Sequence, residues 1–261
     1  MVKTPDELAL MRISGRLLAS VFEMLDGQDL AGMSTMAVND LVERYITMDL
    51  AARPASKGQY GFEYVLNCSI NHVVCHGVPA PDEIIRDGDI INLDITLEKN
   101  GFIADSSKTY LVGDVPPAAR RLVRVTQEAM WQGIAQVRPG AHLGDIGFAI
   151  ERHAKRHGYA VVRDYCGHGI GREMHEEPQV LHFGRRGTGL ALREGMVFTI
   201  EPMLNQGTRK VSTQSDGWTV VTNDRKLSAQ FEHMVAVTRT GVEVLTLRRD
   251  ERAMGERWAA L

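Results

Sequence analysis

Five residues spread along the chain have side chains that commonly bind divalent metal ions. Four of them are carboxylates, and the fifth is an imidazole: Asp94, Asp105, Glu201, Glu232 and His168. Both glutamates lie in apolar stretches typical of strands, where a buried carboxylate needs a counter-charge. Hard oxygen ligands with one nitrogen suit Mn, Co, Fe or Zn. Because four negative charges balance two divalent ions, the set predicts a dinuclear hydrolytic centre.

A predicted hairpin over residues 90–112 would bring Asp94 and Asp105 together. Its turn is Asn100–Gly101, and Asn-Gly is the strongest short hairpin signal. A two-residue turn pairs position 94 with position 107, which shares a face of the strand with position 105. The carboxylates are then diagonal neighbours. A lone Asp would most simply face water, but two adjacent carboxylates need a shared proton or a cation.

His168 lies in the glycine-rich segment Cys166-Gly167-His168-Gly169-Ile170-Gly171. We expect the flanking glycines to let the backbone turn sharply and aim the imidazole. A phosphate-binding loop is the competing interpretation. The G-x-G-x-G spacing disfavours it, because no strand–turn–helix unit with a following acidic residue is evident.

Apolar periodicity predicts the elements that must position these residues. A first helix begins at Pro5, with Thr4 as the N-cap and Glu7 as its capping-box partner. A second helix runs from about residue 34 to 49, and residues 62–78 are extended. After the 90–112 hairpin the pattern repeats, with helices over about 118–137 and 142–157, and then strands at 196–203, a hairpin around 216–217, and a strand at 231–238.

A helix–helix–strands pattern therefore occurs twice, in approximate halves 1–112 and 113–250. The links before the second helix of each half, residues 31–34 and 139–142, also match loosely. We predict an α/β (α+β) fold in a single domain over residues 1–261, with two sheets side by side and four helices on one face. The polar tail, residues 250–261, is expected to fray.

The composition excludes several classes of protein. Hydrophobic residues at 44% and charged residues at 24% are typical of a soluble globular protein, and a net charge of −3 disfavours nucleic-acid recognition. We expect no membrane span and no signal peptide, because no apolar stretch is long enough. Three cysteines without CxxC spacing favour a reducing compartment. The expectation is a cytoplasmic monomer.

The five candidate ligands and their neighbours resemble the metal site of the methionine aminopeptidases. The matching contexts are INLDIT, ADSSK, CGHGIG, FTIEPM and QFEH, and the similarity extends from KTPDELALMRISGRL to LTLRRD. The resemblance implies the pita-bread fold, a pseudo-twofold duplicated domain around a central antiparallel sheet. The chain resembles bacterial type I members, because it lacks the zinc-finger extension of some relatives and the long late insertion of type II members.

The resemblance also implies a role for each ligand. Asp94 would chelate one metal ion, and His168 and Glu201 the other. Asp105 and Glu232 would bridge both ions, which are Co, Mn, Fe or Zn. A monovalent cation, Na⁺ or K⁺, is implied at backbone carbonyls of Asn71, Val73 and Ser228.

The implied reaction is removal of the N-terminal methionine from proteins and peptides, including nascent chains at the ribosome. Hydroxide held by the metals would attack the first carbonyl. Glu201 would accept the proton of the water and return it to the leaving amine. His76 would hydrogen-bond the scissile amide, and His175 would contact the substrate carbonyl.

The substrate pocket departs from the pattern of the family. Trp218 matches an aromatic wall of the methionine pocket. Where bacterial type I members commonly carry Cys, Tyr and Phe, the matching positions here are Ser56, Gln59, Phe62, Asn67 and Met174. We expect a more polar pocket, which costs a methionine side chain about 1–2 kcal/mol of apolar contact.

Three other interpretations compete with this one. A prolidase or other proline-directed peptidase of the same fold generally has a large N-terminal domain, for which this sequence has no room. A paralogue with altered first-residue specificity would follow from the polar pocket. A non-catalytic peptide-binding relative would usually have lost metal ligands, whereas all five are present here.

Overall fold

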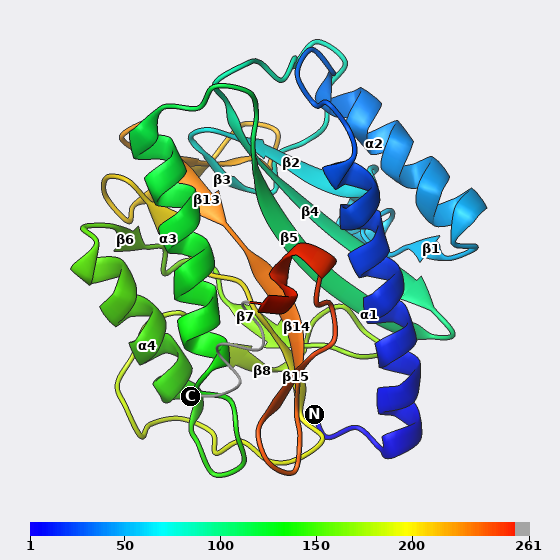
Figure 1. The fold of residues 1–261 in the computed structure, drawn as a ribbon, viewed down its shortest axis with the longest axis vertical. Helices are drawn as coiled ribbons and strands as arrows, with labels where there is room; N and C mark the ends of the chain where they lie inside the picture. The colour runs from blue at the N-terminus through cyan, green and yellow to red at the C-terminus, as the bar shows by residue number, and fades with distance from the viewer. Residues whose placement is uncertain (254–261) are drawn as a thin grey trace.

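Four helices lie over one face of the sheet structure in the computed structural model, which describes residues 1–253 (Figure 1). Between residues 1 and 253, none of the helices combines the length and the apolar character that crossing a membrane requires. The helices are α1 (Pro5–Asp26), α2 (Thr35–Arg44), α3 (Pro117–Ile134) and α4 (Leu143–Arg156), and α2 continues into the π-helical turn η1 (Tyr45–Asp49).

The predicted capping box begins α1. The Thr4 hydroxyl accepts the Glu7 N–H across 3.2 Å, and the Glu7 carboxylate accepts the Thr4 N–H across 3.0 Å. The two bonds satisfy backbone donors that the first turn of a helix leaves unpaired. This helix ends at Asp26, ahead of Gly27.

A nine-stranded antiparallel sheet forms the centre of the molecule. Its strands follow the order β1-β4-β5-β14-β9-β7-β8, with β2 also on β4 and β15 on β14. Strands of both halves therefore share one sheet. The bounds are β1 Arg53–Pro54, β2 Leu66–Ile70, β4 Ile90–Lys99, β5 Phe102–Leu111, β7 Gly167–Gly169, β8 Glu176–Val180, β9 Val197–Ile200, β14 Glu232–Val237 and β15 Val242–Val244.

The hairpin of β4 and β5 has the predicted register. Asp94 lies opposite Ser107, and Asp105 lies opposite Thr96. Both turn residues, Asn100 and Gly101, have positive φ (56° and 79°), as the predicted tight turn requires. The two aspartates are therefore diagonal neighbours on one face of the sheet.

Two three-stranded sheets complete the fold. One joins β6 (Ala160–Val161), β10 (Met203–Asn205) and β13 (Ser228–Gln230). The other joins β3 (Val73–Cys75) to the hairpin of β11 (Val211–Thr213) and β12 (Val220–Thr222). Short 3₁₀ helices lie at η2 (Gln59–Gly61) and η3 (Arg249–Glu251).

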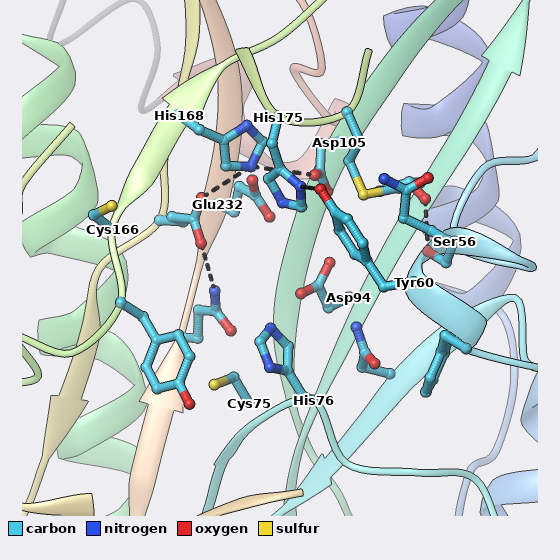
Figure 2. Close-up of a pocket in the computed structure, with 18 of the residues that line it drawn as sticks. Ser56, Tyr60, Cys75, His76, Asp94, Asp105, Cys166, His168, His175 and Glu232 are labelled. Atoms are coloured by element: carbon cyan, nitrogen blue, oxygen red, sulfur yellow. Dashed lines mark hydrogen bonds and ion pairs between the residues drawn. The ribbon is translucent and has the colours of Figure 1, made fainter. Parts of the chain in front are cut away.

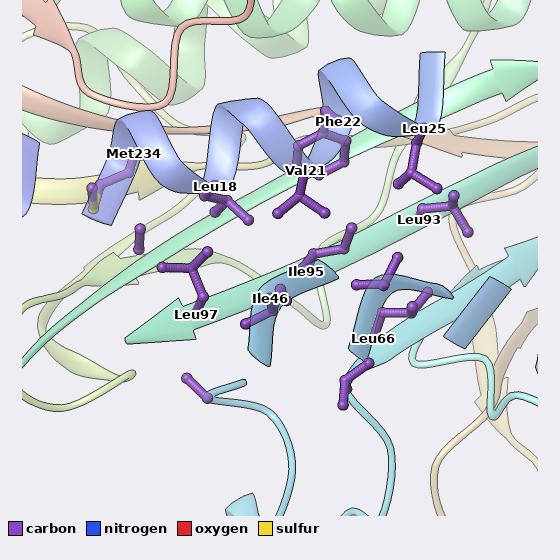
Figure 3. Close-up of a cluster of buried hydrophobic side chains, with 14 of the residues drawn as sticks. Leu18, Val21, Phe22, Leu25, Ile46, Leu66, Leu93, Ile95, Leu97 and Met234 are labelled. Atoms are coloured by element: carbon purple, nitrogen blue, oxygen red, sulfur yellow. The ribbon is translucent and has the colours of Figure 1, made fainter. Parts of the chain in front are cut away.

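Two apolar clusters hold the helices on the sheets. Figure 3 shows Leu18, Val21, Phe22 and Leu25 of α1 above β4, where Leu93 is also fully buried. A second cluster packs α3 and α4 together and includes Leu122, Val125, Met130, Trp131, Ile146 and Ile150. Burial of each such side chain stabilises the fold by about 1.5–3 kcal/mol before entropy is counted. The predicted α/β fold class with a central antiparallel sheet is confirmed.

Two sequence predictions need correction. The strand expected over 196–203 is interrupted, because β9 ends at Ile200 and β10 begins at Met203, leaving Glu201 in the connection. The tail expected to fray from Asp250 contains Glu251, which is buried in η3 because it pairs with Arg248. The remainder of that prediction, residues 254–261, lies outside the described residues.

Candidate metal centre

All five predicted ligands line one pocket of about 580 Å³. Each comes from a different strand of the central sheet or from the residue after it: Asp94 from β4, Asp105 from β5, His168 from β7, Glu201 after β9, and Glu232 at the start of β14. Figure 2 shows the side chains of Asp94, Asp105, His168 and Glu232 gathered with His76 and His175 around a shared space, and Glu201 lines the same pocket. The pairing of β5 with β14 places the carboxylates of the two halves together.

His168 lies close to two of the carboxylates. Its Nε2 is 3.8 Å from Asp105 Oδ2 and 3.5 Å from Glu201 Oε1. Ligand atoms of Asp105, His168 and Glu232 all lie within 4.8 Å of one another. Ligands of one ion, each about 2.0–2.2 Å from it, need to be only slightly closer together than this.

The carboxylates repel one another in a buried environment. Burial raises the pKa of Asp94 to about 7 and the pKa of Glu201 to about 8. Burial and the neighbouring carboxylates also raise the pKa of Asp105 and Glu232 well above their ordinary values. Burial lowers the pKa of His168 to about 4, which keeps its imidazole in the neutral, metal-binding form.

Two carboxylate oxygens show that the residues fit a divalent cation. Asp105 Oδ1 and Glu232 Oε1 are buried and have no hydrogen-bond partner within residues 1–253. Buried polar atoms are nearly always paired, and an unpaired charged oxygen is especially costly. A cation in this group would satisfy both atoms and offset the repulsion.

Neighbouring side chains that sequence analysis did not identify orient the ligands. The Thr199 hydroxyl donates to Glu201 Oε1 across 2.8 Å and accepts the His168 N–H across 3.0 Å. His182 Nε2 accepts the Glu201 N–H at 3.1 Å, and the Gln230 amide lies 3.5 Å from Glu201 Oε2. The available signal was that positions 199 and 201 share a face of the strand predicted over 196–203.

The glycines beside His168 act differently from the prediction. His168 lies in the strand β7, so the expected sharp turn is wrong. A Cβ atom at Gly167 would lie 2.3 Å from Thr199 O, and one at Gly169 would lie 2.1 Å from Glu177 O. The glycines therefore allow β8 and β9 to approach closely and fix the imidazole between them.

The two predicted catalytic histidines border the same pocket. His76 follows β3 with a positive φ of 56°, and its ring meets that of Tyr165 edge-on. The ring of His175 lies 4.4 Å from that of His168, and its Nδ1 is 3.3 Å from the Tyr60 hydroxyl. Burial lowers the pKa of both His76 and His175, which favours neutral rings.

The predicted substrate-pocket residues also line this pocket: Ser56, Gln59, Phe62, Asn67, Met174 and Trp218. The rings of Phe62 and Trp218 are 5.0 Å apart. The Ser56 hydroxyl bonds the Thr96 hydroxyl across 2.6 Å, and Asn67 lies opposite Asp94 in the pairing of β2 with β4.

Asn71, Val73 and Ser228 lie outside the residues that line this pocket. Asn71 has a positive φ of 54°, and its carbonyl accepts the Ser228 N–H across 2.9 Å. The buried Ser228 hydroxyl has no hydrogen-bond partner among the described residues.

Four carboxylates and a neutral imidazole that converge on one pocket fit a metal-dependent enzyme, and the comparison with known families defines the class of the protein as a metallopeptidase. Residues 9–239 match metallopeptidase family M24. The chain is 51% identical over 245 residues to methionine aminopeptidase B of Synechocystis sp., covering 92% of this chain and 89% of the relative. It is 46% identical to the methionine aminopeptidase of Escherichia coli K12, covering 96% and 95% of the two chains.

Solved structures agree with these relatives. The crystal structure of methionine aminopeptidase from Rickettsia prowazekii matches with a TM-score of 0.92 and 47% identity, covering 95% of this chain and 99% of the other. The chain belongs to metallopeptidase family M24 and, within it, to the methionine aminopeptidases of the bacterial type. It uses divalent metal.

Proposed function

We propose that this chain removes the N-terminal methionine from proteins and peptides. The observation that carries the proposal is the convergence of five metal ligands and two neutral histidines on one open pocket. The bacterial relatives at 46–51% identity, which are named methionine aminopeptidases, support the same activity.

The ligand set supports binding of two divalent ions. Asp94 would hold one ion, His168 and Glu201 would hold the other, and Asp105 and Glu232 would be shared by both. The unpartnered oxygens of Asp105 and Glu232 support the bridging role. When bound, such ions supply a nucleophile from water near neutral pH and polarise the scissile carbonyl. Co, Mn, Fe and Zn all suit these ligands.

The residues of the chain then handle the proton and the peptide. Glu201 is proposed to accept a proton from the attacking water and to deliver it to the leaving amine. His76 is proposed to donate a hydrogen bond to the scissile amide, and His175 to the oxygen of the carbonyl. The contact between Tyr60 and His175 would hold the latter ring in place.

The pocket can hold an apolar side chain despite its polar lining. The Ser56 hydroxyl is engaged with the Thr96 hydroxyl, so it does not require a partner from the substrate. Phe62 and Trp218 supply apolar surface. The hydrogen bond between Ser56 and Thr96 therefore reduces the loss of favourable apolar contact that the sequence predicted for a methionine side chain.

The test begins with metal-stripped protein and the peptide Met-Gly-Met-Met. Co, Mn, Fe or Zn is added back separately, and released methionine is measured. Glu201→Ala should abolish metal-restored cleavage, whereas Glu194→Ala, which changes an exposed carboxylate, should not. If no metal restores cleavage of this peptide to the wild-type chain, the proposed function is wrong.

A monovalent cation is proposed at the backbone carbonyls of Asn71, Val73 and Ser228. The unpartnered Ser228 hydroxyl and the left-handed conformation of Asn71 support it. Replacing Na⁺ and K⁺ with a bulky organic cation should lower the melting temperature, and an unchanged melting temperature would exclude the site.

Nascent chains at the ribosome are the proposed physiological substrates, and the cytoplasm is the proposed place of action. Three free cysteines support a reducing compartment. We propose a monomer, which sedimentation can test. Cosedimentation with ribosomes that carry nascent chains, compared with empty ribosomes, tests the substrate.

A further inference from the structure

Glu128, His153 and His157 form a second group of potential metal ligands. His153 lies in the last turn of α4, His157 is its C-cap, and Glu128 lies on the adjacent helix α3. Figure 1 shows α3 and α4 side by side. One ligand atom from each residue lies within 4.8 Å of the other two, and none of the three lines the pocket of the metal centre.

The contacts of the three side chains leave their ligand atoms facing one another. Glu128 Oε1 bonds Arg124 across 2.6 Å, which fixes the carboxylate, while Oε2 lies 3.2 Å from His153 Nε2. The ring centroids of His153 and His157 are 4.6 Å apart. All three side chains are partly buried, so they are held by neighbours and still reached by solvent.

An ion pair between Glu128 and His153 is the simpler explanation, but it leaves His157 unexplained. Burial and the neighbouring His157 lower the pKa of His153, so its ring is held mainly neutral rather than as a cation. Two imidazoles one helical turn apart, beside a carboxylate, make a ligand set typical of zinc. The hydrogen bond from Arg124 orients the Glu128 carboxylate, as the hydrogen-bond partners of metal ligands commonly do.

We propose that Glu128, His153 and His157 bind a zinc ion that links α3 to α4, with water in the remaining position. The ion would connect two helices whose apolar faces form one cluster of the core. Because an ion bound only by the folded chain stabilises it by mass action, the site would raise resistance to unfolding. The inference does not depend on the aminopeptidase activity.

Equilibrium dialysis against buffered micromolar Zn²⁺, followed by a count of zinc per chain, tests the site. Wild type is compared with His153→Gln, His157→Gln and Glu128→Gln. Glu151→Gln is the matched control, because Glu151 lies on α4 but pairs with Lys155 and Arg163. Zinc in the catalytic pocket is common to all five proteins, so differences report the helical site.

The three ligand variants should each bind one zinc ion fewer than wild type and Glu151→Gln. Zinc should also raise the melting temperature of wild type more than that of the three variants. Equal zinc content in all five proteins would overturn the proposal. All five proteins should cleave Met-Gly-Met-Met equally once metal is bound in the catalytic pocket. If the wild-type protein did not cleave this peptide, the result would contradict the proposed function and not the zinc site between α3 and α4.

Discussion

Arg248 and Glu251 form a buried ion pair beside β14, the strand that carries Glu232. The Arg248 Nε donates to Glu251 Oε2 across 2.7 Å, and the two side chains are 0% and 1% exposed. Arg248 also donates to the Ser106 hydroxyl, which in turn donates to the carbonyl of Glu232. A buried charge pair thus supports the backbone of a proposed metal ligand.

Removal of one partner from this pair should be severely destabilising. We expect Glu251→Ala to lower the free energy of unfolding by about 3–5 kcal/mol, because Arg248 would remain buried and uncompensated. Glu243→Ala, which breaks the partly exposed pair with Arg12, should cost less than about 1 kcal/mol. Urea denaturation measures both, and similar losses in the two variants would contradict the prediction.

Gly77→Ala should impair catalysis by moving His76. A Cβ atom at Gly77 would lie 1.9 Å from Cys68 O, so the loop must shift. Since a displacement of about 1 Å can reduce the rate about 100-fold, we expect kcat/KM to fall by that order. Gly241→Ala, where a Cβ meets no atom within 4 Å, is the control. A Gly77→Ala variant with normal kcat/KM would show that the position of His76 does not matter.

Trp218→Ala should weaken recognition of the first residue. Its ring packs against Phe62 at the wall of the pocket, and lost burial of about 1.5–3 kcal/mol corresponds to a decrease of about 10–100-fold in kcat/KM for Met-Gly-Met-Met. Phe148→Ala changes an aromatic residue on α4, away from the pocket, and should leave kcat/KM unchanged. Equal effects of the two substitutions would remove Trp218 from the substrate site.

Metal-free protein should lose stability as the pH rises. Burial raises the pKa of Asp94 from 3.8 to about 7 and that of Glu201 from 4.5 to about 8. The folded state therefore binds protons more tightly than the unfolded state. This contribution is complete below about pH 4 and disappears as the pH passes through about 7–8.

Calorimetry in a chelating buffer between about pH 5 and 9 should show the melting temperature falling. Divalent metal should reverse the decline by neutralising the carboxylates, and Glu201→Gln should make the metal-free decline shallower. A metal-free melting temperature that rises over this range would contradict the assigned direction of both pKa shifts.

Part of the site and of the fold could be predicted because the contacts that form it join residues close to one another in the sequence. The Asn100–Gly101 turn determines the register that makes Asp94 and Asp105 neighbours. Thr4 and Glu7 begin α1 through contacts within one helical turn. In these cases the interacting residues are close in sequence, so residue type and spacing were sufficient.

The remaining features depend on contacts between distant segments. Gly167 and Gly169 are required by the approach of β9 and β8, which periodicity cannot show. The sequence alone predicts an exposed Glu251, whereas in the structure Glu251 is buried and pairs with Arg248 and His233. Likewise, the spacing of His153 and His157 is visible in the sequence, but the helix that brings Glu128 beside them is not.

Because β5 pairs with β14, peptide cleavage requires both halves of the chain. Asp94 and Asp105 lie in the first half of the chain, whereas His168, Glu201 and Glu232 lie in the second, and the pairing of the two strands helps to bring the groups together. A chain interrupted during synthesis, or cut between its halves and separated, would hold an incomplete set of ligands. We therefore expect peptide cleavage only after β14 has been synthesised and has paired with β5.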